Sequence, residues 1–511
     1  METISRKQRV IYNSIANGIY QIVLLISGLI LPRFILLAYG SAYNGLVASL
    51  TQFLSITEIL TMGLAGAARV ELYNSLACND IEKTSGIIKA IKQYMQKATL
   101  IFLFYMLVLL LIYPWFSKDN FSFLEITSLL VIIGVGNIVT YVCGYAYKVL
   151  LDTDNKTYFY TSLRIFLTIA NVFIAILLIY QNRSIQMVKF FSGVIFAIGP
   201  IFLLVSVPKI YKLNPKAPIE NSWMKNQKYA AANSIALIIH ENTDIILLTI
   251  LTSTKMVSVY SVYNLVIKGL KGILSIFTSS MEPYFGNMWA KQEIDEMRGV
   301  LNRYEYFVVF FISVSLSAAL ALILPFVTLY TRGVNDTEYL LPAFAIAIVL
   351  AELVRCIRIP YLTVVQAAGK YKETQWGAFV EAGLNITVSI ILTIRFGIVG
   401  VAIGTLVANL FRTIHYSWFV SHHLLNRQIR NTFYLLCWSL FNIILNSQLF
   451  NFFCLTFKIE FLSWISWTVG GIMIVSFSIF EVIVSSFIFY KSNLRWIIKF
   501  FETYLNRIKN R

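Results

Sequence analysis

The sequence lacks most of the features that mark a soluble enzyme. Only 13% of its 511 residues are charged, about half the share found in a typical soluble domain. It contains no Walker-type phosphate loop, no cluster of metal-ligating residues and no nucleophile triad. Its five cysteines are scattered without metal-binding spacing, so we expect them to be packing residues without a redox role. We therefore predict that the protein is not an enzyme and holds no cofactor.

Apolar residues are abundant instead. They make up 58% of the chain, and the mean hydropathy is +0.71. This composition is typical of membrane proteins. The net charge of +17 does not indicate nucleic acid, because the basic residues flank apolar runs and do not cluster on a polar domain. No cleavable signal peptide is expected, since residues 2–9 are polar and basic and the next apolar run is long enough to span.

Fourteen apolar runs are long enough to cross a bilayer of about 30 Å. We therefore predict an all-α polytopic membrane protein with about fourteen transmembrane helices. The runs lie at about 11–37, 44–67, 87–113, 123–147, 158–180, 184–206, 229–251, 257–281, 304–329, 338–362, 374–395, 397–420, 431–450 and 463–490.

Lysine and arginine are concentrated in alternate connections. Several precede the first run, follow the second, separate the sixth from the seventh and close the chain, whereas most of the opposite loops carry one basic residue. Basic residues favour the cytoplasmic side of a membrane. Both termini are thus predicted to be cytoplasmic, in agreement with the even number of spans.

A polar link at 207–228 divides the chain. Residues 1–206 form a predicted N-lobe of six helices, 229–425 a C-lobe of six, and 426–511 two further helices with a basic tail. A repeat supports two pseudo-symmetric lobes, because Asn-Ser-Ile-Ala at 13–16 recurs 220 residues later at 233–236. Transporters built from such parallel repeats bind substrate between their halves and alternate access to the two sides.

The seventh and eighth runs carry charges near their middles. The first of them reads NSIALIIHENTDIILLTIL and the second VYNLVIKGLKGILSIF. A charge at the bilayer centre costs about 2.5–3.5 kcal/mol on insertion scales, so such groups usually face a partner or a wet cavity. We expect substrate binding and its driving force to meet in this hairpin.

Two longer segments resemble a known family. They are YGSAYNGLVASLTQFLSITEILTMGLAGAARVELYNSLACNDIEK and EAGLNITVSIILTIRFGIVGVAIGTLVANLFR. Both are similar to segments of Wzx-type oligosaccharide-lipid flippases of the MOP exporter superfamily, which also contains MATE drug exporters and lipid II flippases. The resemblance implies fourteen helices arranged as six, six and two. It also implies a monomer that moves undecaprenyl-pyrophosphate-linked oligosaccharide across the bacterial cytoplasmic membrane, beside other polysaccharide-assembly proteins.

Such a substrate requires fixed cations for its pyrophosphate. Lysines three residues apart share a helix face, and the planar guanidinium of arginine suits phosphate oxygens. Glu352 is expected to neutralise part of this charge, and snorkelling to lipid headgroups explains Arg33, Arg358 and Arg412 about as well. The predicted cavity cations are Lys268, Lys271, Arg355, Arg358, Arg33 and Arg412.

Acidic and amide residues suggest coupling to Na⁺ or H⁺. The resemblance places Glu381 and Asn385 near the cation site that lipid II flippases form between their seventh, eleventh and twelfth helices. Purely structural pairing of Asp244 or Glu241 with the hairpin lysines is an equal alternative. The predicted coupling set is Asp244, Glu241, Glu381, Asn385 and His240, the last as a proton relay.

Four polar residues are weaker candidates for sugar contacts. Asn13, Asn17 and Gln21 form a stripe at i, i+4 spacing in the first run, and Glu58 lies midway along the second. Polar residues in membrane helices more often hold helices together.

Three functions remain from the sequence. The leading one is a polysaccharide-repeat flippase driven by membrane potential or a cation gradient. The alternative is a MATE-like cation-coupled drug exporter, which would prefer an acidic cavity to one with mid-membrane lysines. A polysaccharide polymerase or ligase comes last, because such enzymes work at a large external loop and the outward loops here are short.

Overall fold

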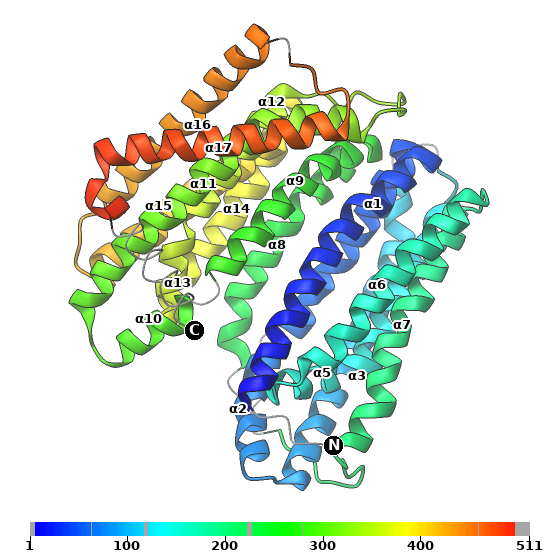
Figure 1. The fold of residues 1–511 in the computed structure, drawn as a ribbon. Helices are drawn as coiled ribbons and strands as arrows, with labels where there is room; N and C mark the ends of the chain where they lie inside the picture. The colour runs from blue at the N-terminus through cyan, green and yellow to red at the C-terminus, as the bar shows by residue number, and fades with distance from the viewer. Residues whose placement is uncertain are drawn as a thin grey trace. The chain divides into compact units, whose positions relative to one another are not determined.

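The protein is helical throughout its described parts. The computed structural model describes residues 6–62, 64–116, 121–221, 227–278, 281–457 and 459–495, and over these residues every regular element is a helix (Figure 1). Ten helical runs among them are long and apolar enough to cross a membrane. The predicted fold class, an all-α polytopic membrane protein, is therefore confirmed.

The chain forms two compact units. Unit 1 comprises Met1–Ser261 with Gly333–Thr337, and unit 2 comprises Val262–Arg332 with Glu338–Arg511. The division falls within a helix of the charged hairpin and not at the polar link 207–228. The predicted six-helix lobes at 1–206 and 229–425, with the final pair in 426–511, stay a prediction.

Unit 1 contains the helices of the first half of the chain. They are α1 Arg6–Ser55, η1 Ile56–Thr61, α2 Leu64–Ala77, α3 Ile81–Phe116, α4 Phe123–Val139, η2 Thr140–Gly144, α5 Tyr145–Thr153, α6 Thr157–Tyr180, α7 Ile185–Ile210 and α8 Gln227–Leu251. Helix α9, Thr254–Thr278, begins in unit 1 and ends in unit 2.

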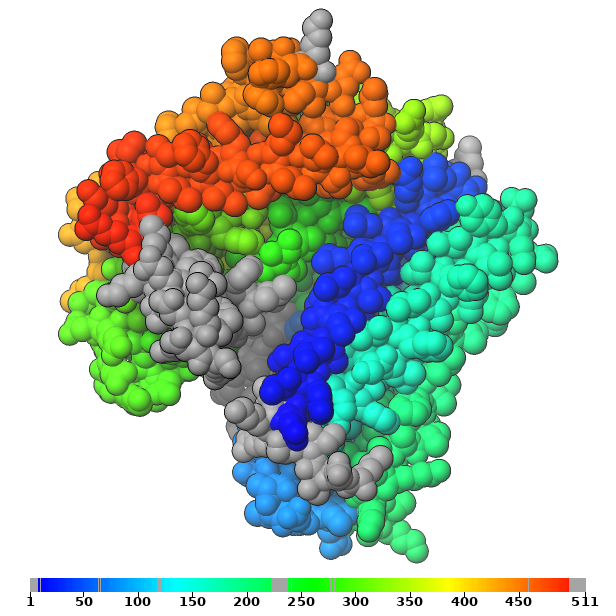
Figure 2. All heavy atoms as spheres, in the orientation of Figure 1, coloured from blue at the N-terminus to red at the C-terminus, as the bar shows by residue number. Residues whose placement is uncertain are grey.

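The remaining helices belong to unit 2. They are α10 Met281–Ala290, α11 Ile294–Tyr330, α12 Pro342–Ile357, α13 Ile359–Ala367, α14 Tyr371–Phe396, α15 Ile398–Phe419, η4 Val420–Leu424, α16 Arg430–Phe457 and α17 Trp464–Phe489. Helix α17 lies at the surface with side chains such as Ile465 and Phe480 largely uncovered, as expected for a lipid-facing helix (Figure 2).

Several predicted spans are interrupted. The span at 338–362 is divided at Arg358 into α12 and α13. Pro360 follows closely, and its ring lacks an N–H and clashes with the carbonyl of Cys356, four residues earlier. The span at 123–147 contains a π-helical turn, η2, which widens the helix at residues 140–144.

The first two predicted spans are joined through a sharp bend at Gly40. Its φ of 80° is left-handed, a conformation that glycine adopts without steric cost. The helix restarts at Ser41, whose N–H donates to Oδ2 of Asp336 at 2.8 Å and whose hydroxyl donates to Oδ1 at 2.5 Å. Lys255 Nζ donates to the Asp336 carbonyl oxygen at 3.0 Å. The loop segment at 333–337 thus caps the restarted helix and packs with unit 1.

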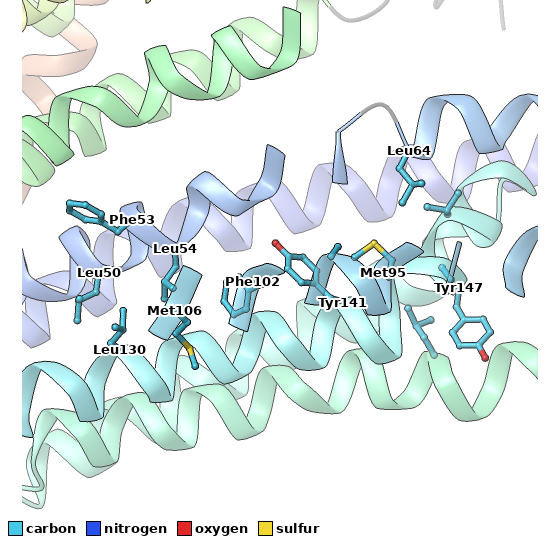
Figure 3. Close-up of a cluster of buried hydrophobic side chains, with 14 of the residues drawn as sticks. Leu50, Phe53, Leu54, Leu64, Met95, Phe102, Met106, Leu130, Tyr141 and Tyr147 are labelled. Atoms are coloured by element: carbon cyan, nitrogen blue, oxygen red, sulfur yellow. The ribbon is translucent and has the colours of Figure 1, made fainter. Parts of the chain in front are cut away.

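The core of unit 1 forms where α1, α3 and α4 meet. Leu50 and Leu54 of α1 pack near Phe102 and Met106 of α3, with Leu130 of α4 beside them (Figure 3). Leu50 and Phe102 are completely buried. Burial of such a side chain contributes about 1.5–3 kcal/mol relative to exposure to water. Lipid is as apolar as the side chains, so within the membrane this gain is absent and close packing with few voids holds the helices together.

Candidate functional site

Two of the predicted cations line one cavity within unit 2. Lys271 extends from α9 and Arg355 from α12 into a cavity of about 330 Å³. Ser275, Thr278, Thr363 and Gln366 contribute hydroxyl and amide groups to its lining. The break between α12 and α13 places the last turn of one helix and the first turns of the other at the same cavity. A substrate with anionic and hydroxyl groups matches this lining.

Glu352 organises the two cations. Its side chain is only 4% exposed, and it accepts hydrogen bonds from Arg355 Nε at 2.8 Å and Nη2 at 2.5 Å. Lys271 Nζ lies farther away, at 3.7 Å, and is 37% exposed. Glu352 therefore neutralises and orients the arginine, as expected from the sequence. The ammonium of Lys271 is held more loosely and is the cation better placed to turn toward an incoming anion.

The cavity is less cationic than the sequence suggested. Glu282, exposed on α10, also lines it, so the carboxylates of Glu282 and Glu352 balance the charges of Lys271 and Arg355. Lys268 is exposed one helical turn before Lys271 and lies outside the described lining. An anion that entered this cavity would thus compete with carboxylates for the cations.

Arg358 and Arg412 lie outside the described lining of the Lys271 cavity. Arg358 Nη1 bonds to Oε1 of Glu381, and Arg412 Nε lies 3.3 Å from Oε2 of the same carboxylate. All three side chains are at most 10% exposed. A second set of contacts immobilises Arg412, since it donates to the Thr374 carbonyl at 2.9 Å and to the Tyr416 hydroxyl at 2.7 Å. Their assignment as cavity cations stays a prediction, and in this structure Glu381 holds both arginines inside the protein.

The same cluster changes the interpretation of Glu381. It was predicted to bind a coupling cation, yet two guanidinium groups contact its carboxylate. Gly377 makes room for the cluster, because a Cβ there would lie 2.4 Å from Arg412 Nη1. Asn385, one turn further along α14, donates to Thr405 Oγ1 at 3.0 Å, while its buried Oδ1 has no hydrogen-bond partner in the described structure. A cation at Glu381 would have to displace an arginine.

The acids of α8 have different environments. Asp244 is buried and accepts a hydrogen bond from the Tyr260 hydroxyl at 2.8 Å, whereas Glu241 is exposed. The side chain of His240 lies outside the described residues. Asp244 belongs to unit 1 and Glu381 to unit 2. A shared coupling site formed by this set stays a prediction, as does a cationic ring that includes Arg33, which is half-buried on α1.

The polar stripe on α1 serves partly as a structural contact. Asn13 Nδ2 donates to the carbonyl of Asn155 at 3.0 Å, and its Oδ1 accepts from the Tyr158 N–H at 2.7 Å. Asn13 therefore fastens α1 to the turn between α5 and α6, and it is better explained as interhelical glue than as a sugar ligand. Asn17 and Gln21 are exposed.

Glu58 lines a separate cavity within unit 1. This cavity measures about 320 Å³ and is also lined by Asn137, Tyr141, Tyr145 and Lys148. The π-helical turn η2 supplies part of the wall. Aromatic rings beside a carboxylate and an amide can contact either a sugar or an organic cation, so the lining alone does not distinguish the two.

The sequence analysis missed two buried acids. Glu305 on α11 forms a bidentate ion pair with Arg427. Arg427 Nη1 also donates to Asn302 Oδ1 at 2.6 Å. Glu481 on α17 accepts from Asn446 Nδ2 at 2.6 Å. A signal for Glu481 was available, because it is the one charged residue in the apolar run 463–490.

The fold is that of known membrane transporters. No family model matches the sequence, and no curated protein matches it. Among solved structures, the lipid II flippase MurJ in an inward closed conformation aligns with 94% of this chain and 99% of its own, with a TM-score of 0.68 and 15% identity. A MATE multidrug transporter, DinF-BH in complex with R6G, aligns with 85% of this chain and 98% of its own, with a TM-score of 0.56 and 16% identity.

A third structure has the same architecture. An inward-facing multidrug resistance MATE family transporter of the MOP superfamily aligns with 80% of this chain and 93% of its own, with a TM-score of 0.55 and 12% identity. At such low identity these similarities establish the fold and leave the substrate undetermined.

Proposed function

We propose that this chain is a MOP-superfamily transporter that moves polyprenyl-pyrophosphate-linked oligosaccharide across the bacterial cytoplasmic membrane. The observation that carries the proposal is the cavity that Lys271 and Arg355 line among helices that lie within predicted spans. Cations inside a membrane span are costly, so they are kept where they serve an anion, an acid or a water-filled path. The fold shared with a lipid II flippase supports a lipid-linked substrate.

The loosely held ammonium is central to the proposed binding step. Lys271 is 3.7 Å from Glu352 and more than a third exposed, so it can turn to a phosphate oxygen without leaving a buried charge unpaired. Arg355 stays oriented by its two hydrogen bonds to Glu352. The glycan would contact the hydroxyl and amide groups of the lining, while the polyprenyl tail stays in lipid. In this proposal the protein works as a monomer with cytoplasmic termini, alongside other polysaccharide-assembly proteins.

A flipping assay tests the proposal directly. The purified protein is placed in proteoliposomes with a fluorescent polyprenyl-pyrophosphate-linked oligosaccharide, and the accessibility of the glycan on each leaflet is followed. We expect Lys271→Ala with Arg355→Ala to reduce the rate at least about tenfold, since loss of about 1.4 kcal/mol of binding corresponds to that factor. The matched control is Lys372→Ala, a cation exposed on α14. An unchanged flipping rate in a double variant that inserts normally would refute the role of Lys271 and Arg355 in pyrophosphate binding.

A second candidate is a cation-coupled drug exporter. It is favoured by the cavity around Glu58, where a carboxylate lies with Tyr141 and Tyr145. Aromatic faces and a carboxylate attract organic cations. Export of ethidium by the same proteoliposomes, lost in Glu58→Gln and retained in the Lys271 and Arg355 variants, would establish this function in place of the first.

A further inference from the structure

A buried polar stripe joins the last two helices within unit 2. On α16 it contains Asn442 and Asn446, and on α17 it contains Glu481 and Ser485. Asn446 Nδ2 donates to Glu481 Oε2 at 2.6 Å, and Ser485 Oγ donates to Asn442 Oδ1 at 2.9 Å. From the Asn442–Ser485 pair to the Asn446–Glu481 pair, the residue number rises by four on α16 and falls by four on α17. The two helices are therefore antiparallel, and the two pairs lie on successive helical turns.

Glu481 differs from every other buried carboxyl group among the described residues. It is 8% exposed, its hydrogen-bond donor is the uncharged amide of Asn446, and its Oε1 has no hydrogen bond within the described part of the chain. The other buried carboxyl groups have a guanidinium or hydroxyl partner: Glu305 with Arg427, Glu352 with Arg355, Glu381 with Arg358 and Arg412, and Asp244 with Tyr260.

The environment of Glu481 favours a neutral group. An ionised carboxylate buried with one amide partner is strongly disfavoured, so burial here stabilises the protonated carboxyl group. Two more oxygen atoms nearby in the stripe, Asn446 Oδ1 and Ser478 Oγ, are buried without a hydrogen-bond partner in the described structure. Hard metal cations are held by about six or more oxygens, whereas a proton needs one. The three oxygens therefore favour a proton over a metal cation.

A series of polar groups connects Glu481 with a cavity. Trp438 lines a cavity of about 450 Å³ where α16 begins and α17 ends, and its Nε1 donates to Ser485 Oγ at 3.2 Å. From there the contacts continue through Asn442 and Asn446 to the carboxyl group.

Beyond Glu481 the helices are closed by a cluster of apolar side chains. It contains Ala318, Leu322, Phe450 and Ile474. The hydrogen-bonded contacts of Glu481 therefore lead toward the Trp438 cavity, and apolar side chains lie in the opposite direction. On the predicted topology the Trp438 cavity is on the cytoplasmic side.

The neighbouring helices present few ionisable groups to this stripe. Tyr306 of α11 stacks on Trp438 with ring centroids 5.7 Å apart, and Tyr490 lies 5.0 Å from the same ring. Cys437 and Cys454 are on α16, at the cavity and beside the apolar cluster. No Lys, Arg, Asp or Glu of α11, α16 or α17 forms an ion pair with Glu481 in the described structure.

We propose that Glu481 is a proton-binding site that couples the transporter to the pH gradient. In the uptake step α16 and α17 separate at the end away from the Trp438 cavity, and a proton from water on that side forms the carboxylic O–H bond. In the release step that bond breaks and the proton passes to water at the Trp438 cavity, on the other side of the membrane. The proposal rests on the proposed transport function, and it places proton exchange on α17 instead of at Glu381 or Asp244.

Two measurements on Glu481→Gln test it, with Glu460→Gln, an exposed acid in the connection between α16 and α17, as the matched control. Glutamine keeps an oxygen to accept from Asn446. Infrared pH-difference spectra of the purified protein should show a carboxylic-acid carbonyl band that disappears in Glu481→Gln, shifts in Glu481→Asp and persists in the control. In proteoliposomes, an imposed pH gradient should accelerate flipping by the native protein and by the control, and should have no effect on Glu481→Gln.

Each contrary result has a distinct meaning. An unchanged infrared band in Glu481→Gln would overturn the proton site. Loss of the band with an intact response to the gradient would make the proton structural and would also overturn the proposal. Displacement of the band by Na⁺ at constant pH would replace the proton with sodium. If the native protein moved no lipid-linked oligosaccharide, the proposed function would fail, while the infrared result would still decide whether Glu481 titrates.

Discussion

Replacing Glu381 with glutamine should strongly destabilise the protein. The carboxylate contacts both Arg358 and Arg412, and the three side chains are nearly inaccessible to solvent. Glutamine has a similar shape but leaves two buried guanidinium groups without their counter-charge. Removing one partner of a buried ion pair typically costs about 3–5 kcal/mol. The thermal midpoint of Glu381→Gln in detergent should therefore fall by several degrees.

A matched substitution on the same helix provides the control. Glu373 also lies on α14, and its partner Lys370 is 2.9 Å away, but both side chains are substantially exposed. Exposed pairs contribute about 0–1 kcal/mol, so Glu373→Gln should leave the midpoint nearly unchanged. The comparison separates loss of a buried charge from loss of any carboxylate on this helix.

A double-mutant cycle identifies the cause. Because Arg358→Gln removes one of the uncompensated charges, the double variant should be less destabilised than the sum of the single variants, by about 0.5–3 kcal/mol. Additive effects would refute the ion-pair explanation. A Glu381→Gln protein of native stability that had lost Na⁺ or pH dependence would refute it as well, and would restore Glu381 as the coupling site.

The bend at Gly40 and the hydrogen bonds of Asn13, both in α1, give further predictions. Gly40→Ala should destabilise the protein by about 1–2 kcal/mol because alanine must adopt a left-handed conformation. Asp336→Ala should cost about 1.5–3 kcal/mol by removing the acceptor of two hydrogen bonds from Ser41. Thermal unfolding measures both, and native midpoints would contradict the capping role. Asn13→Ala should cost about 1–3 kcal/mol, whereas Gln21→Ala should stay within about 0.5 kcal/mol. Equal effects at the two positions would exclude Asn13 as interhelical glue.

Hydropathy and charge spacing were sufficient to predict the helical architecture. Each apolar run of about 20 residues must satisfy its backbone groups internally in lipid, and only a helix does so within one segment. The charges of Lys271, Arg355 and Glu352 were recognisable for the same reason, since ionisable groups inside such runs are rare and expensive. The bend at Gly40 was less evident, because its cap at Asp336 comes from a segment almost 300 residues away.

The partners of the charged residues could be decided only by the tertiary structure. Arg355 and Arg358 are three residues apart, yet one lines a cavity with Lys271 and the other is buried against Glu381. Their contacts differ because Arg358 lies at the break between α12 and α13, and because Glu381 of α14 and Arg412 of α15 are in contact with each other. Glu481 is a second example. The sequence shows only that it is a charged residue in an apolar run, whereas the packing of α16 against α17 shows that its partner is an amide. Sequence locates charge in a membrane, and helix packing determines what each charge contacts.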